Sequence, residues 1–203
     1  MRTAVRSGLI ALGVALVACA GLALAHEEKG KQAAEAMPPE MAEMMKLAEP
    51  GEHHKHMAKM VGSWKTQGKF WMTPGAPPEE SQGSMTVKPA LDGRFFLSDF
   101  QGEFMGGPFH GMGMDGYDNL KQKHVGTWVD SMGTMLMVFE GTCSEGGKVT
   151  ESKSTFDDPM TKKPSYMRMV SRWKDDNTVL LESYSPGPDG KEMKNMEILY
   201  TRQ

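Results

Sequence analysis

Three histidines stand close together near the start of the chain, where their side chains could hold a metal ion. His53, His54 and His56 fall in a polar segment that continues into Met57 and Met60. Imidazole nitrogens and thioether sulfurs both suit copper. The cluster therefore predicts a copper site, although a solvated polar helix face explains the same three histidines without a metal.

Methionine is unusually frequent, with 20 residues among 203. Methionine fills irregular gaps in protein interiors, so core packing is the simpler interpretation. The alternative is an envelope copper-binding or stress protein that uses the histidine and methionine clusters together.

A second group of candidate residues lies near the C-terminus. On an extended strand, Tyr166, Arg168 and Arg172 share one face, and Met167 and Met169 share the other. An inward arginine face would suit an anionic ligand. An inward methionine face would give an apolar, adaptable cavity. In a third interpretation the arginines meet solvent, because charged side chains are rarely buried without partners.

Two aromatic residues and one acid complete the predicted ligand site. Phe70, Trp128 and Asp130 lie in segments that otherwise read as apolar strands. Together with the tyrosine and the two arginines, they are predicted to contact a small apolar or amphipathic ligand.

The sequence favours no enzyme class. It contains no G-x-S-x-G, no Gly-rich phosphate loop and no H-E-x-x-H. The run Gly111–Gly116 superficially resembles a dinucleotide fingerprint, but it has no βαβ context. Cys143 has no flanking histidine and is not expected to be a catalytic thiol. An enzyme using Asp99 or Asp130 as a base is the least supported hypothesis.

The elements that position these residues are β-strands. After Val61, short β-branched and aromatic runs alternate with turn signals such as Asp92-Gly93. No segment between them is long enough for a crossover helix, so the strands must be antiparallel. The expected strands are Ser63–Thr73, Gln82–Leu91, Arg94–Phe104, Phe109–Tyr117, His124–Asp130, Thr134–Glu140, Lys148–Phe156, Ser165–Lys174, Thr178–Ser185 and Met193–Arg202.

This all-β pattern predicts an antiparallel up-and-down barrel of about ten strands. Closure removes the exposed edges of so wide a sheet, and the even hairpin spacing favours a barrel over a two-sheet sandwich. One or two short helices, over Glu40–Ala48 and Glu52–Val61, precede the strands. A barrel of this size encloses a ligand-sized cavity, which favours a non-enzymatic binding protein.

The first 25 residues carry the pattern of an export signal. Arg2 and Arg6 precede the apolar run Leu9–Ala20, which is too short for a membrane span. An A-x-A site predicts cleavage after Ala25 and a periplasmic or secreted protein. In the alternative, Cys19 ends a lipoprotein-like box and would be lipidated, giving an envelope lipoprotein.

Cleavage would leave a flexible tail and short helix over residues 26–50 and a barrel domain over 51–203. Cys143 would then stand alone, so no intramolecular disulfide is possible. The net charge of −3 lacks the basic excess of nucleic-acid-binding proteins. The remaining expectation is a small-molecule partner and no membrane span in the mature chain.

The start of the first strand, Gly62–Trp64, resembles the G-x-W element of the calycins, the lipocalin-like barrels. This resemblance implies that Trp64 plugs the barrel base and that Arg202, on the last strand, stacks over it. Such a contact contributes about 0.5–2 kcal/mol. Some barrels of this kind bind haem through a late-strand histidine. No histidine follows His124, so no haem or other cofactor is expected.

Most of the chain, from about Pro50 to Gln203, is similar to a bacterial domain-of-unknown-function family (number 1579). The similarity implies a calycin-like fold, no established activity and no catalytic residue. It is carried by Phe70–Pro78, Gly116–Asn119, Thr127–Thr134, Asp157–Thr161 and Gly187–Lys191.

Overall fold

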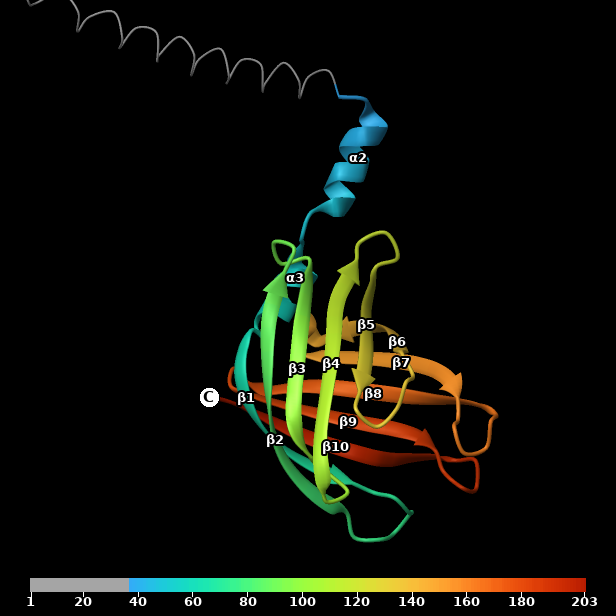
Figure 1. The fold of residues 1–203 in the computed structure, drawn as a ribbon. Helices are drawn as coiled ribbons and strands as arrows, with labels where there is room; N and C mark the ends of the chain where they lie inside the picture. The colour runs from blue at the N-terminus through green and yellow to red at the C-terminus, as the bar shows by residue number, and fades with distance from the viewer. Residues whose placement is uncertain (1–36) are drawn as a thin grey trace, which may run out of the picture. The chain divides into compact units, whose positions relative to one another are not determined.

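A computed structural model describes residues 37–203 (Figure 1). The predicted signal peptide, the lipidation at Cys19 and the tail up to residue 36 lie outside the described residues. The barrel belongs to a compact unit that spans Glu49–Gln203, and helix α2, Pro39–Ala48, belongs to a separate unit. None of the described helices is long and apolar enough to cross a membrane.

Within residues 37–203, two short helices precede the strands, as predicted. In α2, Pro39 occupies the first turn, where a missing N–H costs nothing. Helix α3, Glu52–Ala58, ends three residues before the expected end, Val61. It packs against strands β3 and β4 of the barrel.

Ten antiparallel strands close into one barrel, which confirms the predicted fold over the sandwich. Each strand pairs with its neighbours in the chain, and β1 pairs with β10 to close the ring (Figure 1). The strands are β1 Gly62–Phe70, β2 Glu79–Ala90, β3 Phe95–Phe104, β4 Gly107–Asp118, β5 Lys123–Asp130, β6 Met137–Ser144, β7 Val149–Asp157, β8 Pro164–Asp175, β9 Thr178–Pro186 and β10 Glu192–Arg202. A short 3-10 turn, η1, Glu145–Gly147, joins β6 to β7.

The turns follow from residues that tolerate left-handed backbone. Asp92 and Gly93, between β2 and β3, have φ values of 56° and 79°. Aspartate and glycine adopt this conformation at low cost, and it allows the chain to reverse within a few residues. These local turns make each hairpin and thus the chain-order pairing of the barrel.

The end of the barrel next to α3 is closed by packed side chains. Trp64 is fully buried, and its Nε1 donates a hydrogen bond of 2.8 Å to the carbonyl of Met60. The guanidinium of Arg202 lies 4.3 Å from the centroid of the Trp64 ring and donates to the carbonyls of Val61 and Lys59. This is the arrangement that the G-x-W resemblance implies, and it ties the last strand to the start of the first.

Candidate functional site

Strand β8 turns its methionines toward the barrel interior. Met167 pairs with Ser154 and Met169 pairs with Ser183, and these serines are only 1% and 0% exposed. Cross-strand partners project to the same side of a sheet. The methionine face therefore lines the interior, and Arg168, on the opposite face, points outward. Of the arrangements that the sequence left open, the structure has the one in which the arginine face lies outside the barrel.

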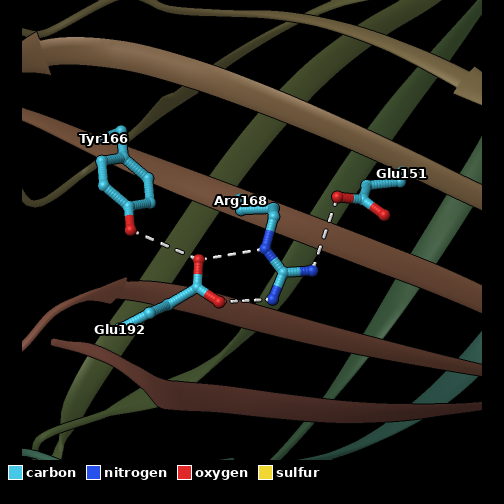
Figure 2. Close-up of polar contacts among 4 residues, drawn as sticks. All are labelled: Glu151, Tyr166, Arg168 and Glu192. Atoms are coloured by element: carbon cyan, nitrogen blue, oxygen red, sulfur yellow. Dashed lines mark hydrogen bonds and ion pairs between the residues drawn. The ribbon is translucent and has the colours of Figure 1, made fainter.

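On the outer face, Arg168 already has protein partners (Figure 2). Its Nε and Nη2 donate to the Glu192 carboxylate at 3.0 and 2.6 Å, and Nη1 lies 3.6 Å from Glu151. The hydroxyl of Tyr166 also donates to Glu192, at 3.4 Å. The hydrogen bond from Arg168 lowers the pKa of Glu192. This network engages Tyr166 and Arg168, two of the three residues of this face that were predicted to bind an anion.

The six predicted ligand residues therefore fall into two sets that do not meet. Tyr166, Arg168 and Arg172 share the outer face of β8, whereas Phe70, Trp128 and Asp130 lie on strands β1 and β5. The last two belong to the interior face, because Asp130 pairs with the buried Gly111 and the Trp128 ring packs over it.

The Trp128 indole lies across strand β4 inside the barrel. A Cβ built on Gly111 would lie 2.2 Å from this ring, so only glycine leaves it room. The ring Nε1 donates a hydrogen bond of 3.0 Å to Asp130 Oδ2, while Oδ1 accepts from the backbone N–H of Met132. Asp130 thus orients the indole and closes the turn that follows β5.

Phe70 stands at the mouth of the barrel, where the β1–β2 and β3–β4 hairpins end. Its ring centroid lies 4.9 Å from that of Phe104. The ring centroid of Phe109 lies 6.0 Å from that of Phe104. Phe109 in turn contacts Phe100 in the core at 5.8 Å. The aromatic rings form a continuous apolar path inward from a hollow of about 310 Å³. This hollow is lined by Phe70, Glu79, Glu80, Ser81, Glu103, Phe104, Met105 and Gly106.

Asp115 places a carboxylate on the interior face of β4. It pairs with Phe96, which is 3% exposed, and with the buried Gly126. A Cβ on Gly126 would lie 2.5 Å from Asp115 Oδ1. Solvent still reaches the Asp115 side chain, but its burial among the barrel atoms raises the pKa of the carboxyl to about 6.

No hydrogen bond or ion pair from another of residues 37–203 holds the Asp115 carboxylate. Its charge adds to burial in raising the pKa of Tyr200, a core residue of β10. An interior acid without a protein partner is suited to a ligand group that donates a hydrogen bond or carries positive charge.

Asp115 was not among the predicted site residues, although Gly111–Gly116 lies within the predicted strand Phe109–Tyr117. The alternation within this run held the signal. Gly111, Gly113 and Asp115 occupy one face of β4, whereas Met112 and Met114 occupy the other and are 49% and 41% exposed. The alternation of the strand therefore places two glycines and one acid inside the barrel.

The three histidines predicted to hold copper do not share one site. His54 Nδ1 accepts a hydrogen bond of 3.0 Å from the N–H of Gly51, and the His56 ring lies against Gly147. His53 instead contacts a cysteine on β6. Successive helical residues point about 100° apart, so helix positions 53, 54 and 56 face different neighbours.

A fourth histidine lies beside the His53 ring. His124, on β5, makes an edge contact with it at a centroid distance of 5.5 Å. Burial, together with the charges of the three helix histidines, lowers the pKa of His124 to about 4. This ring is therefore neutral at physiological pH.

The fold resembles barrels of known structure at low sequence identity. Rv2717c from M. tuberculosis is 15% identical with a TM-score of 0.58, and the match covers 76% of this chain and 99% of that chain. The S-type phycobiliprotein lyase CPES from Guillardia theta is 12% identical with a TM-score of 0.55, covering 75% and 95% of the two chains. These likenesses concern the fold alone.

A comparison with curated proteins finds no match. A protein-family profile, in contrast, matches residues 49–202, nearly the whole barrel unit. The profile is described as "Protein of unknown function (DUF1579)", which agrees with the predicted resemblance. The chain belongs to this family and folds as a calycin-like barrel.

Proposed function

We propose that this protein is a non-enzymatic barrel that binds a small amphipathic molecule in its interior. The apolar body of the ligand lies against the aromatic side chains, and a hydrogen-bond-donating or cationic group meets Asp115. The observation that carries this proposal is the solvent-accessible interior carboxylate, for which the described chain offers no partner.

Two buried hydroxyls give further support. The Oγ atoms of Ser154 and Ser183 are buried without a hydrogen-bond partner among residues 37–203. Leaving such a group unsatisfied costs about 1–3 kcal/mol, so a water or a ligand atom is expected to satisfy it. Met167 and Met169 lie beside these serines, and flexible thioethers adapt to ligands of different shape.

The two acids considered as catalytic bases are both engaged by protein groups. Asp99 lies on the outer face of β3, where His110 Nε2 is 3.2 Å from its Oδ2. Asp130 accepts hydrogen bonds from Trp128 and from the backbone of Met132. Neither of these two carboxylates is therefore free to act as the base that the enzyme hypothesis assigned to it.

Two fluorescent dyes of different charge test this proposal. Auramine O is cationic and Nile red is neutral, and both fluoresce strongly in apolar sites. Asp115→Asn is expected to weaken auramine O binding at least about tenfold, because a charge-assisted contact contributes about 1.5–3 kcal/mol. Nile red binding should change less than about twofold, since it depends on apolar contacts.

The matched control is Asp99→Asn, the same substitution on the outer face of the neighbouring strand. It should leave the affinity for both dyes unchanged, as measured by fluorescence titration. Failure of both dyes to bind the unmodified chain would contradict the proposed function. An unchanged auramine O affinity in Asp115→Asn would remove Asp115 from the site.

Export is part of the same proposal and rests on the N-terminal sequence. Expression of the full chain in a bacterial host, followed by mass spectrometry of the envelope fraction, reads the new N-terminus. A chain beginning at His26 is expected. A diacylated chain beginning at Cys19 would establish the lipoprotein alternative, and an unprocessed chain in the cytoplasm would contradict export.

A further inference from the structure

Two histidines and a cysteine meet at the closed end of the barrel, beneath α3. The ligand atoms of His53, His124 and Cys143 all lie within 4.8 Å of one another. Cys143 Sγ lies 3.2 Å from His53 Nδ1. All three residues are half-buried. An ion could therefore reach them from solvent, and the surrounding residues would still hold their side chains in place.

The sheet register brings two of the three together. His124 on β5 pairs with Gly141 on β6, and Cys143 lies two residues further along the same strand. Residues two apart on a strand share a face, so His124 and Cys143 are diagonal neighbours inside the barrel. Helix α3 then places His53 next to both.

The position of the His53 ring is fixed by an aromatic neighbour. Tyr117 stacks on it with a centroid distance of 3.9 Å and an interplanar angle of 11°. Tyr117 also pairs with His124 across β4 and β5, and their rings meet edge-on at 5.1 Å. One tyrosine thus holds both imidazoles, and a preorganised ligand set loses little entropy on binding.

An unsatisfied polar atom lies in this cluster. His124 Nε2 is buried and has no hydrogen-bond partner among residues 37–203. A buried nitrogen in this state costs about 1–3 kcal/mol, which a bound ligand would recover.

We propose that His53, His124 and Cys143 form a site for a thiophilic transition-metal ion, zinc or copper. Cys143 binds as the thiolate and releases its proton to solvent, while both imidazoles bind neutral. Tetrahedral zinc bonds of roughly 2.0–2.3 Å place donor atoms roughly 3.3–3.6 Å apart. The donor atoms, which lie within 4.8 Å of one another, would have to move closer together to reach this spacing. Three protein donors leave one coordination position for water or an external ligand.

This site differs from the one expected from the sequence. Of the three neighbouring helix histidines only His53 takes part, and the other donors come from β5 and β6. None of its three donors is a residue that the ligand proposal uses or tests, so the metal proposal and the ligand proposal can fail independently.

Titration with Co²⁺, Zn²⁺ and Cu⁺ tests the site in the full chain carrying Cys19→Ala, which leaves Cys143 as the single thiol. We expect one equivalent of Co²⁺ to give a thiolate-to-cobalt charge-transfer band. Zn²⁺ and Cu⁺ should each displace the cobalt, and the stronger competitor identifies the preferred ion. Cys143→Ser should abolish the band, and His53→Gln should weaken binding at least about tenfold.

His110→Gln is the control, because His110 lies on the outer face in contact with Asp99. It should bind like the parent chain. Since a variant can lose its fold, protection of Cys143 from iodoacetamide by Zn²⁺ is measured on the parent chain as well. Unprotected alkylation, or a stoichiometric cobalt complex that survives Cys143→Ser, would overturn the proposal.

Discussion

At the scale of single residues, the clearest energetic consequence comes from the interior acid Asp115. Its pKa in the folded chain, about 6, lies above the ordinary value of 3.8. The folded state therefore binds this proton more tightly than the unfolded state does. The contribution of Asp115 to the free energy of unfolding should therefore be fully present below about pH 4 and should be lost as the pH rises through 6.

Replacing Asp115 with asparagine removes this penalty without changing the size of the side chain. Asp115→Asn should have a higher Tm than the parent chain at pH 8, and the difference should shrink toward pH 4. Thermal unfolding followed by circular dichroism between pH 4 and 8 measures the effect. A Tm difference that does not vary with pH would refute the interior position of the charge.

Asp99 supplies a comparison of opposite sign. The hydrogen bond from His110 lowers the pKa of Asp99, so its ionised form favours the folded state above the ordinary carboxyl pKa. Asp99→Asn should therefore leave the Tm at pH 8 equal to that of the parent chain or slightly below it. An increase like that of Asp115→Asn would mean that the effect is a general one of lost negative charge.

At the scale of elements, strand β4 is shaped by the ring that crosses it. Gly111→Ala would place a methyl group 2.2 Å from the Trp128 ring. Overpacking of this kind costs about 1–3 kcal/mol, because ring and strand must separate. Urea unfolding should show this loss, and the tryptophan emission should shift as the indole moves.

Gly107→Ala is the matched substitution on the same strand. Apart from the Phe104 carbonyl at 3.9 Å, no atom of a non-adjacent residue lies within 4 Å of a Cβ at this position. Its unfolding free energy should stay within about 0.5 kcal/mol of the parent value, since alanine is tolerated where space is open. An equal loss of unfolding free energy in Gly111→Ala and Gly107→Ala would show that the contact with the Trp128 ring is not the cause of the loss at Gly111.

The strands and their order could be predicted from the sequence, because the signals for both are local. Strand alternation and turn residues are encoded within about ten positions, so all ten strands and the chain-order barrel could be predicted. The direction of β8 could not, because both of its faces carry apolar residues. Val170 is 3% exposed although it shares the outer face with Arg168 and Arg172. Long arginine stems can cover such a residue.

At the scale of the whole molecule, the candidate sites depend on contacts that no local pattern contains. His124 and Cys143 become neighbours through the register of β5 on β6, and His53 joins them through the docking of α3. Three histidines in sequence looked like one site, yet the helix directs them apart. The residue types in the sequence indicated a metal site, but only the β5–β6 register and the position of α3 show which residues come together.

The closure of the barrel has a consequence for how the chain can be cut. The strand order around the ring is the order along the chain, and Trp64 at the start of β1 pairs with Arg202 at the end of β10. In such a ring every strand has the same kind of neighbours, so the chain could begin at any strand and still form the same pairs. A linker between Gln203 and Glu49, with new termini opened in an exposed hairpin, keeps the same strand order around the barrel, so the domain is suited to circular permutation.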